Sequence, residues 1–415
     1  MDAKNTDVQN QKDTLRGGLI GYGARGRDLL PNAILPIPQV QVTAVCDVYQ
    51  DRAQAAAQKV QELRGVSPAV YLDYRELLAD SQVDAVIISA SWEAHTPIAL
   101  AAMEAGKIVA SEVGGALTLE ECWELVHTYE RTRTPIMFLE NCCYGRNELM
   151  ILNMVRQGLF GEIVHCQGGY RHDLRDEVSY GRENRHYRLN HYLHRCCENY
   201  PTHELGPIAK ILNINHGNRM LTLSSVASCA KGLHTYLARE KGDSYDLTHA
   251  DWKQGDVVTT TIRCAGGQTI VLTLDTTLPR YYSRGFHIQG TLGMYEEENQ
   301  SIFLDGVHNE DDFNWRKQWG NLDQYREQYE HPIWKEFLNS GVTGGHGGMD
   351  GLVIGAFVRC ALSGAPMPID VYDMAAWMSI TALSEASIAK GGAPVEIPDF
   401  TSGRWVLPDW KAAEL

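Results

Sequence analysis

The sequence lacks the features that would place a chain in a membrane or on nucleic acid. No apolar run reaches the ~20 residues that a membrane-spanning helix needs. Basic residues are few, with 37 Lys and Arg against 52 Asp and Glu and a formal net charge of −15. This balance disfavours nucleic acid and anionic membranes as partners. We therefore expect neither as a partner.

The beginning of the chain lacks the pattern of a signal peptide. Residues 1–16 are polar and contain no apolar centre. We expect these residues to form a flexible tail. As the sequence stands it predicts a cytoplasmic protein, and a periplasmic or exported one if an N-terminal signal has been removed.

Cysteine pairs with metal-binding spacing are missing too. The sequence has ten cysteines but no CxxC pair, and most of them lie within apolar runs. We predict small buried side chains with free thiols in a reducing compartment, and no structural zinc site. The group His172, Asp173, His191 and His194 has no metal-ligand spacing on a predicted helix or strand. The sequence therefore predicts no metal site.

A glycine-rich stretch near the start has the order of a dinucleotide-binding unit. An apolar run ends in Gly21-x-Gly23-x-x-Gly26, and a second apolar run, 40–46, ends in Asp47. Glycines let the backbone approach a pyrophosphate at a helix N-terminus. An acid about 20 residues further on accepts hydrogen bonds from a ribose and repels a 2′-phosphate. The pattern predicts a Rossmann unit that prefers NAD to NADP.

Three further predicted strands end in polar residues. The strand 84–89 is followed by 91–95, the strand 107–111 by Glu112, and the strand 135–139 by Glu140 and Asn141. In a doubly wound sheet the carboxyl ends of the strands are where ligands bind. Helices are predicted at 50–63, 74–79, 96–105 and 119–132, the last behind a Thr118-x-x-Glu121 capping box.

The character of the chain changes after Tyr144. A helix at 147–156 is followed by alternating, β-rich segments typical of an antiparallel sheet with one solvated face. Between them, the polar and aromatic segment 173–201 is predicted to be a loop that lines a site. Strands are expected at 163–170, 219–227, 256–264, 269–275, 286–290, 294–295 and 301–304, and helices at 350–362 and 372–390.

The fold class expected from these patterns is an α/β Rossmann domain plus an α+β domain with a large, mostly antiparallel open sheet. We place the NAD-binding domain at 17–143 and the domain for substrate binding and oligomerisation at 144–415.

Several motifs resemble those of the Gfo/Idh/MocA oxidoreductase superfamily. Within it, the chain is similar, from about residue 17 to 400, to the NAD-dependent glycosidases of glycoside hydrolase family 109, the α-N-acetylgalactosaminidase family. The motifs that carry the resemblance are the glycine turn GYGARG at 21–26, ENCCYGR at 140–146, GGYRHDLR at 168–175, YPTH at 200–203, YSRG at 282–285 and GGHGGMD at 344–350.

One difference from ordinary sugar dehydrogenases supports the glycosidase resemblance. Those enzymes carry Glu-Lys-Pro, with a lysine that assists hydride transfer, where this chain has Glu112-Val113-Gly114. The chain also departs from the glycosidase pattern. Glu204 stands where the family has glycine, and Cys196-Cys197-Glu198 replaces a more usual Asn-Gly-Asp.

The resemblance implies a redox route to hydrolysis, unlike the usual pair of carboxylates. NAD takes hydride from C3 of the sugar, a base removes the acidified C2 proton, the leaving group departs from C1, water adds, and the hydride returns. His203 suits the base, and Tyr200 and Tyr170 suit the donors, so these three are the expected catalytic residues.

The resemblance also assigns binding residues. Those expected to contact the carbohydrate substrate are Tyr170, Arg188, Tyr200, Pro201, Thr202, His203 and Tyr282. Those expected to contact NAD are Gly21, Gly23, Ala24, Arg25, Gly26, Asp47, Ser91, Trp92, Glu93, Ala94, His95, Glu112, Val113 and Asn141.

Other interpretations stay open at this stage. The chain could be an NAD-dependent sugar dehydrogenase of the Gfo/Idh/MocA type, or a non-catalytic protein that binds NAD or senses sugar. His203 could be a helix N-terminal histidine bonded by Glu204, and His346 could belong to a structural glycine-rich turn. The superfamily further implies a homo-oligomer that pairs through the open sheet.

Overall fold

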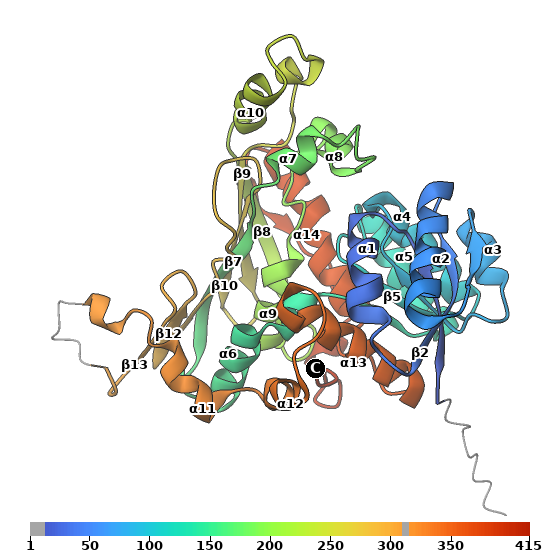
Figure 1. The fold of residues 1–415 in the computed structure, drawn as a ribbon. Helices are drawn as coiled ribbons and strands as arrows, with labels where there is room; N and C mark the ends of the chain where they lie inside the picture. The colour runs from blue at the N-terminus through green and yellow to red at the C-terminus, as the bar shows by residue number, and fades with distance from the viewer. Residues whose placement is uncertain (1–12, 309–314) are drawn as a thin grey trace, which may run out of the picture.

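The first part of the chain forms a parallel sheet. A computed structural model describes residues 13–308 and 315–415 (Figure 1). Six parallel strands take the order β3-β2-β1-β4-β5-β6, which is that of a Rossmann fold. The strands are β1 (Leu15–Ile20), β2 (Val40–Cys46), β3 (Ala69–Tyr71), β4 (Ala85–Ile88), β5 (Ile108–Ser111) and β6 (Ile136–Phe138).

The start of this sheet corrects the predicted tail. Leu15 and Arg16, which were assigned to the tail, belong to β1, where Leu15 pairs with Val40 and Arg16 with Gln41 of β2. Residues 1–12 lie outside the described residues.

Five helices accompany the parallel strands. The capping box is confirmed: the Thr118 hydroxyl accepts a hydrogen bond from the Glu121 backbone N–H at 3.1 Å. One helix begins four residues earlier than predicted, at Trp92. Residues 92–95 already belong to the helix, with Ser91 as its N-cap and Pro97 in its second turn. The helices are α1 (Ala24–Leu29), α2 (Gln50–Arg64), α3 (Tyr74–Ala79), α4 (Trp92–Glu104) and α5 (Leu119–Thr132).

The second sheet has eight strands in the order β13-β12-β11-β7-β10-β9-β8-β14. Only the pair β7 and β10 is parallel among the pairings of this sheet in the described chain, so the predicted fold class is confirmed. The strands are β7 (Ile163–Arg171), β8 (Met220–Ala227), β9 (Val257–Cys264), β10 (Thr269–Asp275), β11 (His287–Gly290), β12 (Gly293–Glu296), β13 (Ser301–Leu304) and β14 (Val395–Glu396).

One long helix joins the two sheets. α14 (Val371–Ala389) lies between them in Figure 1 and contacts α5 on one side and β8 on the other. The Phe138 backbone N–H of β6 also donates to the Ile369 carbonyl at 3.0 Å. Buried side chains of both parts therefore form one continuous core. Other helices are α6 (Arg146–Arg156), α9 (Thr202–Ile211), α10 (Gly232–Glu240), α11 (Arg326–Tyr329), α12 (Pro332–Ser340) and α13 (Met349–Ser363).

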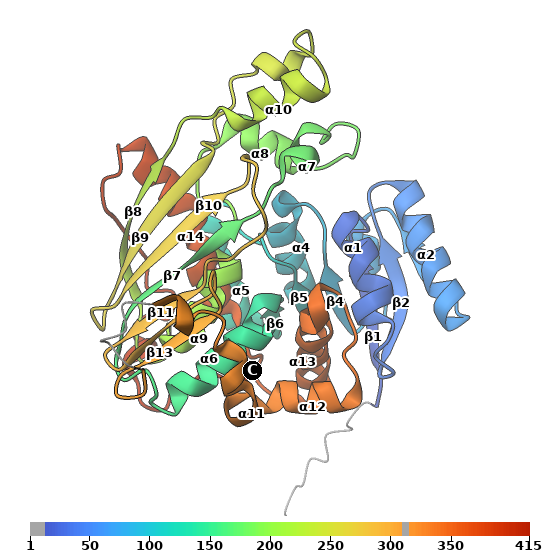
Figure 2. The same cartoon turned by 60° about the vertical axis from the view of Figure 1, so that its left-hand side comes forward.

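The segment 173–201 is more ordered than the loop predicted for it. It contains α7 (Arg175–Ser179) and α8 (Arg188–His194), because Val178, Leu189 and Tyr192 pack into a second, smaller core. Figure 2 shows these helices above α4, where the second sheet reaches toward the parallel one. Across this boundary, Asn184 accepts a hydrogen bond through its carbonyl from the Arg52 guanidinium at 2.9 Å.

Two composition-based expectations can be compared with the structure. All ten cysteines have free thiols, as predicted, and most are buried, although Cys229 is exposed. Among the described residues, no helix is both long and apolar enough to cross a bilayer.

Candidate active site

The glycine turn at the end of β1 has no room for a Cβ at Gly21 or at Gly26. Gly21 has φ +96°, and a Cβ there would lie 2.6 Å from the Ala90 backbone nitrogen. A Cβ on Gly26 would lie 2.3 Å from the Gly21 carbonyl oxygen. Gly23 precedes the first turn of α1. The turn therefore keeps its backbone open to a ligand at the start of a helix, as a pyrophosphate requires.

The acid at the end of β2 is held in place by backbone groups. Asp47 accepts hydrogen bonds from the N–H groups of Tyr22 at 2.7 Å and Tyr49 at 2.9 Å, one on each carboxylate oxygen. It is buried and lies at the edge of a cavity of about 1060 Å³. The fixed carboxylate and the glycine turn fit the ribose and pyrophosphate of a dinucleotide.

The cavity is lined by about half of the residues predicted to contact NAD: Gly21, Gly23, Ala24, Arg25, Asp47, Ser91, Glu93 and Ala94. Residues of the 176–187 segment close its other side. The predicted contacts outside the lining are Gly26, Trp92, His95, Glu112, Val113 and Asn141.

His95 lies outside the cavity lining and contacts the turn after β4. Its Nε2 lies 3.0 Å from the Ala90 carbonyl oxygen. Burial lowers the pKa of this imidazole to about 4, so the ring is neutral near pH 7. A structural role in fixing the turn after β4 accounts for these contacts.

Trp92 explains the glycine in Glu112-Val113-Gly114. A Cβ on Gly114, whose φ is +85°, would lie 2.0 Å from the Trp92 indole nitrogen. The indole thus fills the space that a larger residue at position 114 would need. The packing of Trp92 therefore leaves no room at position 114 for the proline of the Glu-Lys-Pro motif.

The residues predicted to act on substrate gather in a tyrosine–histidine cluster, which we define as Tyr170, Tyr200, His203 and Tyr282. Ring centroids of Tyr170 lie 4.5 Å from those of Tyr200, 5.3 Å from His203 and 6.3 Å from Tyr282. Tyr170 comes from β7, Tyr200 precedes α9, and His203 lies in the first turn of α9. Pro201 and Thr202 lie between these two and are buried. Tyr282 is half exposed.

Burial keeps the phenols of this cluster protonated. It raises the pKa of Tyr170 to about 12, despite the opposing charge of Arg188, and raises that of Tyr200 well above its usual value. Next to them, burial and the charge of Arg188 lower the pKa of His172. The His172 Nδ1 lies 2.8 Å from the Tyr170 hydroxyl. A neutral imidazole there can accept the phenol proton, a role that the sequence did not assign.

Arg188 connects the cluster with the cavity. Its guanidinium carbon lies 5.2 Å from the ring centroids of both Trp92 and Tyr200. Nη1 donates to Glu177 at 2.5 Å, and Glu177 lines the cavity. The buried Nε has no hydrogen-bond partner within residues 13–308 and 315–415. A buried donor of this kind points to a bound ligand.

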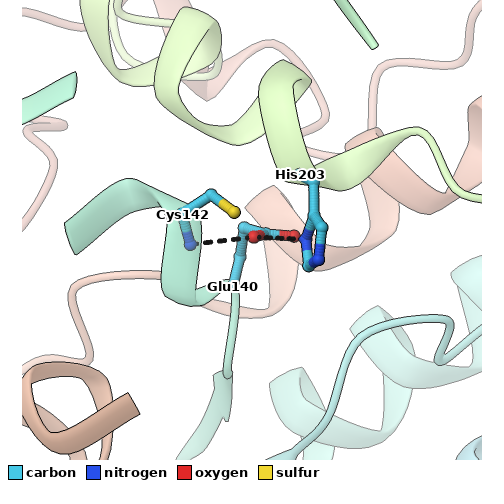
Figure 3. Close-up of side chains that lie close together, drawn as sticks. All are labelled: Glu140, Cys142 and His203. Atoms are coloured by element: carbon cyan, nitrogen blue, oxygen red, sulfur yellow. Dashed lines mark hydrogen bonds and ion pairs between the residues drawn. The ribbon is translucent and has the colours of Figure 1, made fainter. Parts of the chain in front are cut away.

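Glu140 holds the ring of His203 (Figure 3). Its Oε1 lies 2.9 Å from His203 Nδ1 and accepts the Cys142 backbone N–H at 3.0 Å. Burial opposes ionisation of Glu140, but the charge and hydrogen bond of His203 hold the pKa of the carboxyl below its usual range. The bond fixes Nδ1 and leaves Nε2 as the nitrogen that can meet a substrate.

This contact contradicts the alternative in which Glu204 bonds His203. Glu204 turns instead toward the Arg284 guanidinium, with Oε2 3.4 Å from Nε. Sequence reasoning placed Glu140 at the end of a strand but gave it no role. The signal was an acid at the ligand-binding edge of the sheet, while its partner lies 63 positions away in the sequence.

Within residues 13–308 and 315–415, two groups of side chains have donors close enough to hold a metal: Glu140 with Cys142 and His203, and Asp28 with His346 and Asp350. In the first, burial raises the pKa of the Cys142 thiol well above its usual value, so no thiolate is offered. In the second, the Arg25 guanidinium lies between the donors, 2.8 Å from Asp350. Both groups are explained by hydrogen bonds and ion pairs.

Fold and site together define a class of protein. The glycine turn, the fixed acid and the cavity at the carboxyl edge of the parallel sheet are those of an NAD-binding oxidoreductase fold. Residues 15–138 match the family described as oxidoreductase family, NAD-binding Rossmann fold.

The second part identifies the family. Residues 144–407 match the glycosyl hydrolase 109 C-terminal domain. The chain belongs to glycosyl hydrolase family 109, and is thus a glycosidase with an NAD-binding domain.

Relatives cover nearly the whole chain. A glycosyl hydrolase family 109 protein of Stenotrophomonas maltophilia is 41% identical, covering 94% of this chain and 90% of its own length. An alpha-N-acetylgalactosaminidase of Tannerella forsythia is 38% identical, covering 94% and 87%. Among solved structures, a levoglucosan dehydrogenase in complex with NADH and L-sorbose is similar at TM-score 0.68 and 19% identity, covering 94% of this chain and 100% of that one. This last likeness supports the fold.

Proposed function

We propose that the protein hydrolyses terminal α-N-acetylgalactosaminides or a related glycoside by transient oxidation at C3, with NAD recycled in each turnover. The observation that carries the proposal is the position of the tyrosine–histidine cluster beside the dinucleotide cavity, with Trp92 and Arg188 between them. The name of the Tannerella forsythia relative supports the choice of sugar.

Each side chain of the cluster has a chemical role in this proposal. Bound NAD would supply the hydride acceptor, and later the hydride donor, for C3 of the sugar. Tyr170 and Tyr200 offer protonated phenols to sugar oxygens, and His172 can accept the proton that Tyr170 releases. Once C3 is a ketone the C2 proton is acidic, and His203 Nε2, oriented through Glu140, is the base that removes it.

Elimination then completes the cleavage. The electron pair left at C2 forms a double bond to C1, and the leaving group departs from C1 with a proton from an acid in the site. Water adds across that bond before the ketone is reduced. Atoms and electrons balance without net oxidation, so the cofactor is catalytic.

The choice of cofactor rests on Asp47. Its carboxylate lies where the ribose of an adenosine binds in this fold and would repel the 2′-phosphate of NADP. We therefore propose NAD as the cofactor. A dehydrogenase that depends on the missing lysine is disfavoured, because position 113 is valine and Trp92 packs on Gly114.

Release of p-nitrophenol from α- and β-linked N-acetylhexosaminides, hexosides and uronides, with and without added NAD+, tests the proposal. We expect cleavage of the α-N-acetylgalactosaminide that depends on NAD+, with no stoichiometric increase in NADH absorbance. Stoichiometric NADH from free sugars, with no aryl glycoside cleaved, would instead identify a dehydrogenase and overturn the proposal.

A further inference from the structure

Asp350, a carboxylate of the second domain, contacts residues at the edge of the parallel sheet. Asp350, in the first turn of α13, is fully buried. Its Oδ1 accepts hydrogen bonds from Arg25 Nη2 at 2.8 Å and Asn141 Nδ2 at 2.7 Å. Its Oδ2 accepts one from Arg25 Nη1 at 2.8 Å and lies 2.8 Å from His346 Nδ1. Both oxygens are therefore saturated.

The partners of Asp350 come from separate strands of the parallel sheet. Arg25 follows β1 and Asn141 follows β6. The Arg25 Nη2 also donates to Glu112 Oε1 at 2.9 Å, and Glu112 follows β5. Asp350 of α13 thus contacts the residues that follow β1 and β6 directly. It is linked to the residue that follows β5 through Arg25. Arg25 itself lines the dinucleotide cavity, so Asp350 acts on the cavity through it.

The geometry of the arginine contact is that of a strong, directional pair. Two parallel N–H groups of one guanidinium meet the two oxygens of one carboxylate, which fixes the plane of the guanidinium as well as its position. Burial opposes the charged form of Asp350, but Arg25 and His346 hold the pKa of its carboxyl far below the usual value. The ionised carboxylate of Asp350 therefore balances the positive charge of Arg25 next to the cavity.

The glycine-rich motif before α13 is explained by this contact. A Cβ on Gly345 would lie 2.6 Å from Asp350 Oδ2 and 2.9 Å from Asp28 Oδ2. Gly348 has φ +103°, a conformation that favours glycine. The loop 344–348 can therefore pack directly on the carboxylate and place His346 beside it.

We propose that Asp350 is a positioning residue for the dinucleotide site: it holds Arg25, which lines the cavity, in the orientation in which the guanidinium meets the cofactor. The inference rests on the proposed use of NAD. Without the carboxylate, the guanidinium and the amide lose their shared partner and the glycine turn loses its link to α13. Cofactor affinity then falls, while the tyrosine–histidine cluster keeps its own contacts.

The test compares Asp350→Asn with Asp373→Asn. Asp373 is also buried, lies on α14, pairs with Lys210 at 2.6 Å and accepts Asn215 Nδ2 at 3.1 Å. It therefore controls for the loss of a buried ion pair near the same core. NAD+ retained after extensive dialysis, and the dissociation constant for added NAD+ by calorimetry, are measured together with the midpoint of thermal unfolding.

We expect Asp350→Asn to bind NAD+ on the order of ten- to a hundredfold more weakly. A loss of affinity in this range is typical when a residue that orients a ligand-binding side chain is removed. At saturating NAD+, its KM for the aryl glycoside stays within about twofold of wild type. Asp373→Asn lowers the unfolding midpoint but leaves NAD+ affinity unchanged. Equal NAD+ affinity of Asp350→Asn and wild type, or an equal loss in both variants, would overturn the inference.

His346→Ala keeps the test decisive if Asp350→Asn does not fold. This half-exposed residue supplies one of the contacts to Asp350, so its loss should weaken NAD+ binding about threefold. Unchanged affinity in His346→Ala would then count against the inference. Wild-type protein that binds NAD+ but cleaves no glycoside would contradict the proposed function alone, since every comparison above is made on binding.

Discussion

The dinucleotide cavity and the tyrosine–histidine cluster are neighbours that are built in opposite ways. The wall of the cavity at β1 and β2 is backbone: a turn without room for a Cβ at Gly21 and Gly26, and an acid, Asp47, held by two amides. The cluster is made of side chains, and burial raises the pKa of its phenols Tyr170 and Tyr200. The proposed function assigns cofactor binding to the first region and proton transfer to the second. Variants should therefore separate cofactor affinity from turnover.

The largest effect is expected from removing the base. His203→Gln should lower kcat on the order of 10²- to 10⁴-fold, because a neutral amide cannot take the C2 proton. NAD+ affinity should stay within about twofold, since His203 belongs to the cluster. Steady-state kinetics and calorimetry on one preparation check both. A parallel loss of NAD+ binding would show that the two regions are not separable.

A smaller loss should follow when only the orientation of that base is changed. Glu140→Gln preserves size but replaces the carboxylate that faces His203 Nδ1 at 2.9 Å. We expect kcat to fall about 10- to 100-fold, and the free energy of unfolding by about 1–3 kcal/mol because the contact is buried. Urea unfolding and kinetics measure the two effects. Full activity would exclude an orienting role for Glu140.

On the cavity side, the glycine turn can be altered without touching the cluster. Gly26→Ala would place a Cβ 2.3 Å from the Gly21 carbonyl oxygen, so the turn must open. We expect NAD+ to bind at least about tenfold more weakly, with unchanged KM for the glycoside at saturating NAD+. Gly65→Ala is the control: Gly65 is the C-cap of α2, at φ +70°, and its Cβ would meet nothing within 4 Å. We expect Gly65→Ala to lower the free energy of unfolding by about 1 kcal/mol and to leave the affinity for NAD+ unchanged.

The smallest effect is in the pH dependence. His172 must be neutral to accept the Tyr170 proton, and its folded-state pKa is lowered by burial and by the charge of Arg188. Protonation of His172 should therefore limit activity only at pH values below about 6.5, the ordinary value for histidine. Profiles of kcat/KM for wild type and His172→Gln isolate this contribution. An acid limb above about 6.5 that is present in wild type and disappears in His172→Gln would contradict the assignment.

The same two regions show what the sequence could reveal. The spacing from Gly21 to Asp47 is local, so it predicted the turn, the strand and the acid before any tertiary contact was known. The capping box at Thr118 is predictable for the same reason, because its partner Glu121 lies only three positions away. By contrast, only a family resemblance brought Tyr170, Tyr200 and Tyr282 together, because no local pattern links β7, α9 and the segment before β11.

What the sequence could not reveal depends on contacts between distant segments. The helix α4 begins at Trp92, four residues before the predicted start, and the first residue packs against distant aromatic rings that its sequence neighbours do not reveal. The pairing of Glu140 with His203, and of Asp350 with Arg25, joins residues whose neighbours in sequence give no hint of a partner. The glycine-rich turn at His346 was left open between structural and catalytic roles, and its hydrogen bond to Asp350 now supports the structural one.

The most direct test of the account is the fate of the hydrogen at C2 during hydrolysis in D2O. If the cluster removes that proton next to a cofactor that takes and returns the C3 hydride, the released sugar should carry deuterium at C2 and protium at C3, as read by NMR and mass spectrometry. The variant His203→Gln should lose both cleavage and exchange. Product that retains protium at C2 would contradict the account, because cleavage would then proceed without the proton transfer that the cluster is proposed to perform.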